Sequence, residues 1–203
     1  MPTTTRSRSA SQSQTDEEIR EHVLATAGRL YYSQGVHAVC MGALRTEAGV
    51  SLKRLYQLFP SKENLVEAVL EHRHHTWNEL VEAAIATGDT PRDRLLAIYD
   101  MLVRWTGEDG FRGCVFINTF GELGGTAPRI VTLIREHKAQ FQARLAELVI
   151  ETGAPIELAH QLAILAEGAQ TTAAIAGTND AACHARTAAA TLIDTALTAI
   201  PAP

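Results

Sequence analysis

A short basic stretch lies within an otherwise acidic chain. The 203 residues carry a formal net charge of −5, but the first 75 hold nine Lys and Arg against eight Asp and Glu. Within residues 45–62, four cations face a single acid: Arg45, Lys53, Arg54 and Lys62 against Glu47. Phosphate binding depends on local contacts that release counterions, and not on the charge of the whole chain. The stretch can therefore supply a surface that contacts nucleic-acid phosphates.

One turn of this stretch carries side chains suited to reading bases. Lys53, Arg54 and Gln57 can supply the exposed face of a helix that enters a major groove. The planar fork of Arg54 can bond O6 and N7 of guanine together, which makes it the candidate base reader, and a solvated surface role is the alternative. Lys62 falls in the first turn of the next helix, where free N–H groups and the helix dipole already attract phosphate.

Presenting these side chains requires two short helices joined by a turn. The pattern predicts one helix over residues 41–48, a left-handed stop at Gly49, and a second helix over residues 52–58 capped by Ser51. Three apolar residues can lock the two helices together: Leu44, Val50 and Leu55. This arrangement is typical of a helix-turn-helix, and an ordinary αα-hairpin with a solvated charged side is the alternative.

The region also shares a set of identities with a known family. They are Leu30-Tyr31 before Gly35, then Ala48-Gly49-Val50-Ser51, Leu55-Tyr56, Phe59-Pro60-Ser61-Lys62 and Leu65. With these residues, about residues 15–70 resemble the amino-terminal signature of TetR-family transcriptional regulators, without gaps. The resemblance implies a homodimer with two helix-turn-helix heads and a carboxy-terminal helical domain that binds a small molecule. It makes Ser51 the cap of the recognition helix, and it makes Tyr56 and Lys62 phosphate contacts.

Four positions depart from the usual pattern of that family. Cys40 stands where Thr or Ser usually caps the second helix, Arg45 where a small alanine is usual, Lys53 where glycine is frequent, and Leu58 where histidine is common. Cys40 weakens the cap, which is worth about 0.5–2 kcal/mol. Arg45 and Lys53 compensate electrostatically, so we include both among the expected DNA contacts.

The carboxy-terminal part offers candidates for a small-molecule pocket. Cys114, Asn118 and Glu122 lie at i, i+4 and i+8, along one side of a predicted helix, interleaved with aromatic residues such as Phe120. A few polar groups in an apolar setting are what such a pocket needs. The full candidate set is Trp105, Cys114, Asn118, Phe120, Glu122, Phe141 and Gln170. Satisfied core or surface roles are the alternative for each of them, and a redox-sensing role for Cys114 is set against that of a small buried hydrophobe.

Helix signals recur along the whole chain. With 46% apolar and 20% charged residues the composition is that of an ordinary globular protein, and no strand-like alternation bounded by turns appears. We predict an all-α fold of about nine helices. Besides the two short ones, helices are expected over about 16–34 after a Thr15–Glu18 capping box, from Ser61 to about 85, from Pro91, over about 113–123, from Pro128 to Gly153, and after Pro155 and Asp180.

Three segments follow from these patterns. Residues 1–14 lack apolar periodicity and are predicted to be a disordered basic arm, residues 15–61 a DNA-binding domain, and residues 62–203 a ligand-binding and dimerisation domain. Residues 155–200 contain fifteen alanines, and small residues let helices approach closely. We expect the last two helices to form a two-fold interface, because one recognition helix offers too few contacts for specific binding. Packing within one chain is the alternative.

Other chemistries find little support in the sequence. The three cysteines are too few for a disulfide framework, and no apolar run is long enough to span a membrane, so we expect a cytoplasmic protein. Among His72, His74 and His75, only His72 and His75 have a spacing that suits one metal ion, and the sequence indicates no third ligand for it. Glu157 and His160 form a Glu-x-x-His motif, but the second copy that a di-iron site needs is absent from the sequence. We therefore expect no metal, no cofactor and no catalytic residues.

Two functions remain in view. The resemblance implies a sequence-specific regulator of transcription, typically a repressor, that binds a double-stranded operator and releases it when a small molecule enters the carboxy-terminal domain. The alternative is an all-α small-molecule-binding protein or enzyme that uses the same cavity. The alternative predicts no salt-dependent affinity for DNA, and the sequence contains none of the common catalytic or nucleotide-binding motifs.

Overall fold

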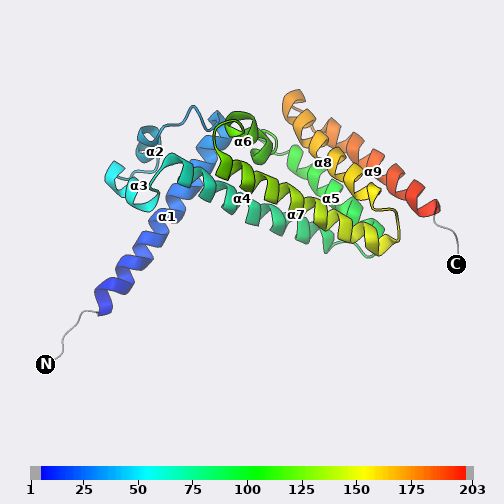
Figure 1. Cartoon of the computed structure of the whole chain (residues 1–203), viewed down its shortest axis with the longest axis horizontal. Coiled ribbons are helices and arrows are strands. Elements are labelled where there is room, and N and C mark those ends of the chain that lie inside the picture. The colour runs from blue at the N-terminus through cyan, green and yellow to red at the C-terminus, as the bar shows by residue number, and fades with distance from the viewer. Residues whose placement is uncertain (1–5, 200–203) are drawn as a thin grey trace.

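The computed structural model describes the backbone of residues 6–199 and the side chains of residues 16–199. Across this range the chain forms nine helices and no strand, which confirms the predicted all-α class (Figure 1). The helices are α1 (Arg6–Gln34), α2 (Met41–Glu47), α3 (Leu52–Leu58), α4 (Lys62–Ile85), α5 (Pro91–Thr106), α6 (Val115–Leu123), α7 (Pro128–Thr152), α8 (Glu157–Ala176) and α9 (Asp180–Thr198). None of them, within the described range, is long and apolar enough to cross a membrane.

The first helix begins earlier than the sequence predicts. α1 starts at Arg6 and not near residue 16, so Thr15 lies inside the helix and is not its cap. No proline interrupts residues 6–34, and Ser, Thr and Gln cost only fractions of a kcal/mol each relative to alanine, so a helix formed further along can extend through them. Of the predicted disordered arm, residues 6–14 are therefore helical, and residues 1–5 lie outside the described residues.

The remaining helix boundaries follow local signals that the sequence displays. The side-chain oxygens of Ser51, Ser61 and Thr90 accept hydrogen bonds from the amide N–H three residues later, which satisfies one free donor at the start of α3, α4 and α5. Cys40 plays the same part for α2 through its sulfur, with Ala43 N at 3.4 Å from Sγ. Cys40, whose cap the sequence predicts to be weak, thus still caps α2, with its sulfur as the acceptor.

The molecule is elongated, with α2 and α3 near one end and α8 and α9 near the other (Figure 1). We call α1–α3 the head and α5–α9 the body. One core joins the head to the first half of α4, and it includes Leu44, Leu55 and Leu65, which have no exposed surface. The second core lies between the second half of α4 and the helices α5, α7, α8 and α9. α4 is therefore shared by the two cores.

A carboxylate ties α6 to the end of α1. Glu122 on α6 accepts hydrogen bonds from the backbone N–H of Val36 at 2.9 Å and of His37 at 2.7 Å, and His37 Nε2 bonds the Glu122 carbonyl oxygen at 3.0 Å. Gly35 makes this possible, because its φ of +88° is left-handed and a Cβ there would lie 3.1 Å from Glu122 Oε1. The body thereby holds the head at a second point besides α4.

We expect Glu122→Gln to lower the free energy of unfolding by about 1–2 kcal/mol, because the amide loses the charge and only one of its two ends can accept. Urea unfolding monitored by circular dichroism measures the change. Glu136→Gln is the matched control, since Glu136 is exposed on α7 and forms no ion pair within residues 16–199. Equal effects of the two substitutions would contradict the role given to Glu122.

Candidate nucleic-acid interface and ligand pocket

The two short helices of the head meet at the predicted glycine turn. Gly49 has a φ of +66°, which confirms the left-handed stop, and Val50 N donates to Arg45 O at 3.0 Å across the turn. Leu44 and Leu55 are fully buried between the helices, and Val50 is half-buried. The three apolar residues expected to lock the helices do so, and they leave the opposite face of α3 open.

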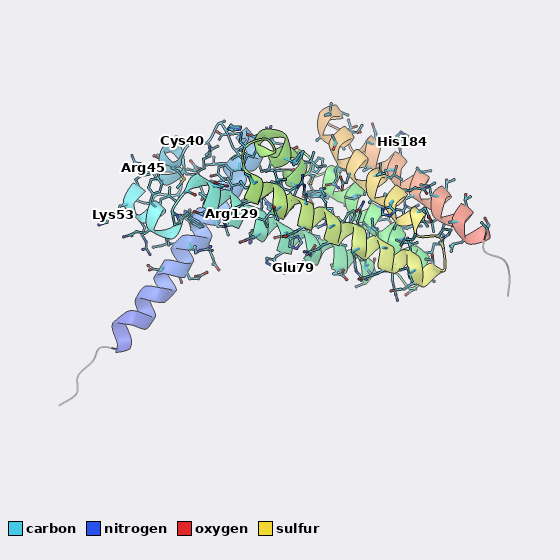
Figure 2. All side chains as sticks on the ribbon, in the orientation of Figure 1. Cys40, Arg45, Lys53, Glu79, Arg129 and His184 are labelled. Atoms are coloured by element: carbon cyan, nitrogen blue, oxygen red, sulfur yellow. The ribbon has the colours of Figure 1, made fainter. Side chains whose placement is uncertain are left out.

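The open face of α3 carries most of the predicted DNA contacts. Ser51, Lys53, Tyr56 and Gln57 are all exposed, and the Tyr56 side chain ranks among the large exposed apolar ones at 45% exposure. Arg45 is exposed at the end of α2. Figure 2 shows Cys40, Arg45 and Lys53 on the side of the molecule away from α8 and α9. Because α2 and α3 pack in one core through Leu44 and Leu55, these side chains lie in the same part of the head.

Arg54 differs from its neighbours because it already has a carboxylate partner. Its guanidinium forms an ion pair with Asp16 of α1, and Nη1 lies 3.5 Å from Gln57 Oε1. Half of the Asp16 side chain is exposed, so solvent screens this pair and it is worth at most about 1 kcal/mol. Arg54 can leave Asp16 at low cost, but in the free protein it is not extended from the surface.

Lys62 is the first residue of α4 and is half-buried beside the cap Ser61. Ser61 Oγ lies 3.1 Å from Asn64 N, and this fixes the start of the helix where the sequence predicts it. The pKa of the nearby Cys40 thiol is lowered, first by the amide N–H of Ala43 and Gly42 and then by the charge of Lys62. Lys62 thus adds a positive charge at the start of α4, where the helix dipole is already positive.

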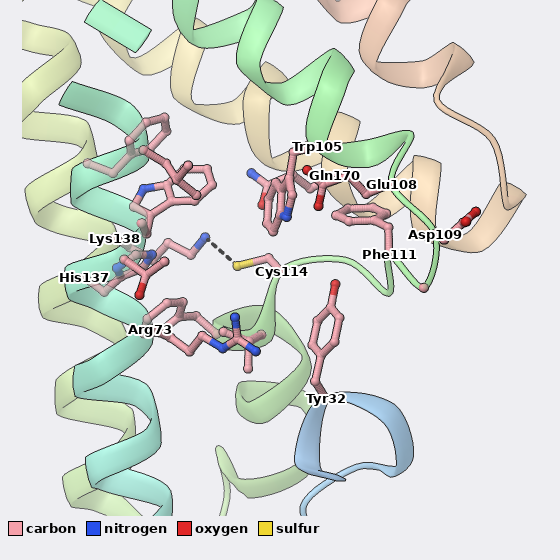
Figure 3. Close-up of a pocket in the computed structure, with 17 residues that line it drawn as sticks. Tyr32, Arg73, Trp105, Glu108, Asp109, Phe111, Cys114, His137, Lys138 and Gln170 are labelled. Atoms are coloured by element: carbon pink, nitrogen blue, oxygen red, sulfur yellow. Dashed lines mark hydrogen bonds between the residues drawn. The ribbon is translucent and has the colours of Figure 1, made fainter. Parts of the chain in front are cut away.

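A pocket of about 210 Å³ opens in the body, at the junction with the head. Of the predicted ligand-binding residues, Trp105, Cys114, Phe141 and Gln170 line it (Figure 3). They come from α5, the cap position of α6, α7 and α8, so residues distant in sequence meet there. Its other walls include Trp77, Phe111 and Phe116, which make the interior largely aromatic.

Asn118, Phe120 and Glu122 do not reach the pocket, which corrects the prediction for these three. The i, i+4 spacing of Asn118 and Glu122 places these two on one side of α6, but α6 turns Val115 and Phe116 toward the pocket. Asn118 Nδ2 donates to Arg112 O at 2.8 Å, Phe120 is 47% exposed, and Glu122 binds the end of α1. A helix has several faces, and spacing alone does not indicate which one is turned inward.

The pocket residues of α1 and α4, and two of those on α7, were not predicted from the sequence. Tyr32 of α1 lines the pocket, its OH donates to Gly113 O at 3.0 Å, and the same oxygen accepts from Arg112 N at 2.7 Å. Arg73 and Trp77 line it from α4, and their i, i+4 spacing was the only local signal that they share a face. His137 and Lys138 contribute from α7.

The pocket contains a thiol beside an ammonium group. Cys114 Sγ and Lys138 Nζ are 3.6 Å apart, as the dashed line in Figure 3 marks. Lys138 also pairs with Glu167 of α8 at 3.3 Å. Glu167 thus neutralises the Lys138 charge from behind the pocket wall, since it is not among the lining residues.

A chain of hydrogen bonds holds His137 in the pocket wall. Asn78 Nδ2 bonds His74 Nε2 at 3.0 Å, and because an amide nitrogen can only donate, His74 carries its proton on Nδ1. His74 Nδ1 donates to His137 Nδ1 at 2.9 Å, so the proton of neutral His137 is on Nε2. The ring stacks on Phe116 at 3.5 Å between centroids. Burial, and then the charge of Lys138, lower the pKa of His137 to about 3.

The head and the pocket together define a class of protein, one with a helix-turn-helix and a separate cavity for a small molecule. Comparison with known proteins shows which family the chain belongs to. Residues 23–69 match the tetR family of bacterial regulatory proteins, and residues 91–189 match tetracyclin repressor-like C-terminal domains. The protein sav143 of Streptomyces avermitilis, whose structure is described as a tetr-transcriptional regulator, is 32% identical, with a TM-score of 0.76 over 88% of this chain and 97% of that one.

Two further proteins agree with this match. SCO4454 of Streptomyces coelicolor, a TetR-family regulator, has the same fold at a TM-score of 0.86, with 22% identity over 96% of this chain and 98% of that one. The transcriptional repressor NemR of Escherichia coli K12 is 28% identical over 111 residues, 54% of this chain, and the match spans about half of NemR, 56% of its length. The chain belongs to the TetR family, as its sequence predicted.

We expect the low pKa of His137 to make stability fall as the pH falls. The unfolded chain takes up a proton at this residue near pH 6.5 whereas the folded chain does so only near pH 3, so folding is disfavoured progressively between these values. Between pH 7 and pH 5 the loss from this residue is about 2 kcal/mol. Urea unfolding of the wild type and of His137→Asn, whose oxygen can still accept from His74, measures it.

Between pH 7 and pH 5, the free energy of unfolding of His137→Asn should fall by about 2 kcal/mol less than that of the wild type, whatever the absolute stability of the variant. His184→Asn, at an exposed position on α9, is the control and should leave the pH dependence unchanged (Figure 2). If His137→Asn followed the same pH curve as the wild type, the uncharged state assigned to His137 would be wrong.

Proposed function

We propose that the chain is a sequence-specific, DNA-binding regulator of transcription, a repressor, whose operator affinity falls when a small molecule binds in the body. The observation that supports this most is the arrangement along α4. Its first half packs in the head beside the basic open face, and its second half lines the pocket through Arg73 and Trp77. On this proposal residues 15–61 form the DNA-binding domain, residues 62–203 form the ligand-binding and dimerisation domain, and the protein acts in the cytoplasm.

In the head, each side chain has a part that its position supports. α3 is the recognition helix, Arg54 and Gln57 contact base edges, and Lys53 reaches the groove or its backbone. A second set contacts phosphates or holds the helix that does, namely Arg45, Ser51, Tyr56 and Lys62. Arg54 exchanges Asp16 for a guanine edge on binding. In the free protein Arg54 is held by Asp16, and because this exposed ion pair is weak, breaking it costs little of the affinity for DNA.

The ligand acts through elements that belong to both regions. Tyr32 of α1 and the pair Arg73 and Trp77 of α4 touch the pocket, so a ligand that displaces them also moves helices whose other parts pack in the head. A tenfold loss of operator affinity requires about 1.4 kcal/mol of preference for the non-binding state. The ligand-binding residues of this proposal are Trp105, Cys114, Phe141 and Gln170, with Tyr32, Arg73, Trp77 and His137 added.

We also propose a homodimer formed by α8 and α9. α8 exposes two large apolar side chains, Ile164 at 72% and Ile175 at 84%, among alanines that allow close helix contact. A two-fold axis there lies at the far end of the molecule from α3, and it presents two recognition helices to successive major grooves about 34–36 Å apart.

The DNA interface is tested on duplexes that the wild-type protein selects from a randomised pool. Lys62→Ala and Tyr56→Phe should weaken binding to selected and unrelated duplexes alike, and Lys62→Ala should reduce the slope of log affinity against log salt by about 1. Arg54→Ala should lower affinity for the selected sequence by about 1–3 kcal/mol while changing unrelated duplexes less. Arg104→Ala, an exposed cation on α5, is the control and should change none of these values. A pool that yields no preferred sequence would sink the proposal.

The dimer is tested by introducing a charge on α8. Ile164→Asp should convert the dimer to a monomer in analytical ultracentrifugation, because two buried carboxylates would face each other across the two-fold axis. The monomer should lose the preference for selected duplexes and keep weak, salt-dependent binding. Ile150→Asp, equally exposed but on α7, is the control and should remain dimeric. A wild-type chain that sediments as a monomer would exclude this interface.

A further inference from the structure

We infer that the pocket between α4, α5, α7 and α8 takes an uncharged aromatic molecule that carries a hydroxyl group, which donates a hydrogen bond to Gln170. The inference names the class of effector and so rests on the proposed function. It does not use the DNA-binding surface in any step, and it can therefore be tested apart from it.

The walls of the pocket suit a flat aromatic ring. Trp105 meets Trp77 at 5.3 Å and Phe111 at 5.0 Å between ring centroids, and Trp77 meets Phe141 at 5.7 Å. The rings are tilted or edge-to-face, the arrangement in which the positive edge of one aromatic meets the negative face of another. A ring entering this group finds faces and edges of the same kind. At about 210 Å³ the space is smaller than that of a pocket for drug-sized ligands, so a single substituted ring fits it best.

Two buried polar atoms on residues of the pocket wall lack a hydrogen-bond partner among the described residues: Gln170 Oε1, which needs a donor, and Trp77 Nε1, which needs an acceptor. A hydroxyl group is both a donor and an acceptor. The Gln170 side chain is 2% exposed and its Nε2 donates to Ala166 O at 3.2 Å, which fixes the orientation of the amide. Gln170 lines the pocket, and its Oε1 has no partner among the described residues. A buried carbonyl oxygen without a donor is unfavourable, and a site of this kind discriminates strongly against a ligand that cannot donate.

Charged ligands suit the pocket poorly. Arg73 and Lys138 line it together with Glu108 and Asp109, so the lining carries side chains of both signs. Lys138 is further neutralised by Glu167 at 3.3 Å, and a carboxylate has no hydrogen to donate to Gln170 Oε1. An ammonium ligand would lie beside Lys138 and Arg73, whereas Glu108 and Asp109 are exposed to solvent and screened. His137 adds no charge, because burial lowers its pKa to about 3.

These observations select one donor group. A hydroxyl on an aromatic ring is uncharged at neutral pH, since the pKa of a phenol is about 10. It can donate to Gln170 Oε1 while the ring remains among the tryptophans. An ether of the same shape has an oxygen in the same place but no hydrogen to donate, so it leaves Gln170 Oε1 unpartnered.

The test compares four probes that share one ethyl-substituted ring: 4-ethylphenol, 4-ethylanisole, 4-ethylbenzoate and 4-ethylbenzylamine. Both tryptophans of the chain, Trp77 and Trp105, line the pocket, so tryptophan fluorescence excited beyond the absorption of phenols reports only on this site. We expect the full-length protein to bind 4-ethylphenol about tenfold or more tightly than each of the other three. Equal or tighter binding of the anisole, the benzoate or the amine overturns the inference, and this comparison needs no variant.

A pair of variants then assigns the preference to one atom. Gln170→Leu should bind 4-ethylphenol and 4-ethylanisole with nearly equal affinity, because the acceptor is gone and the apolar volume remains. Gln161→Leu, at an exposed position on the same helix, should keep the wild-type preference. If Gln170→Leu folds by circular dichroism and still prefers the phenol, the role of Gln170 is wrong.

Operator binding, measured separately, distinguishes this inference from the proposed function. A protein that prefers the phenol but selects no duplex supports the ligand class and contradicts the regulator. A protein that selects a duplex but binds the phenol no better than the anisole keeps the regulator and overturns the ligand class. Where both hold, 4-ethylphenol should also lower the affinity for the selected duplex.

Discussion

The whole structure depends on α4 being one continuous helix that is buried in two separate cores. Leu65, Val66, Val69 and Leu70 pack with the head, and about two turns after Leu70 the residues Trp77, Val81 and Ile85 pack with the body. A helix is stiff along its axis because its backbone hydrogen bonds run from end to end, and interiors as dense as these do not deform gradually. We therefore expect a displacement at Trp77 to be carried along α4 to the residues that hold α3.

Two smaller contacts limit how the head can move about that helix. Glu122 holds the residues after α1 through two backbone N–H groups, and Tyr32 of α1 holds the loop before α6 through its hydroxyl. The end of α6 and the loop before it are thus tied to the head helix α1, and the core of the head extends to Cys114, Phe116 and Ile130. The boundary between the two cores consequently does not coincide with one point in the sequence. The pocket at this junction is lined in part by a residue of the head, Tyr32.

Much of this could be predicted from the sequence, for reasons that differ between the two regions. The helix-turn-helix depends on local chemistry, such as Ser51 and Ser61 as caps and Gly49 in the left-handed region, and local chemistry can be read directly. The pocket depends on which face each long helix turns inward, which is set by contacts between distant segments. Trp105 and Phe141 were identifiable as large apolar residues, whereas Tyr32 and Arg73 were not, and Glu122 proved to serve the junction. The early start of α1 was missed because polar residues of moderate helix propensity carry no boundary signal.

The magnitudes at the pocket fit what regulation of this kind demands. A buried acceptor such as Gln170 Oε1 that lacks a donor costs about 1–3 kcal/mol, and a ligand that supplies the donor recovers that amount. A tenfold change in operator affinity needs about 1.4 kcal/mol of difference between two states of the protein. On the proposed function, a state of the protein that places the ligand against Gln170 gains this hydrogen bond, and a state that does not forgoes it. One hydrogen bond therefore supplies a free-energy difference of the size that the regulation requires.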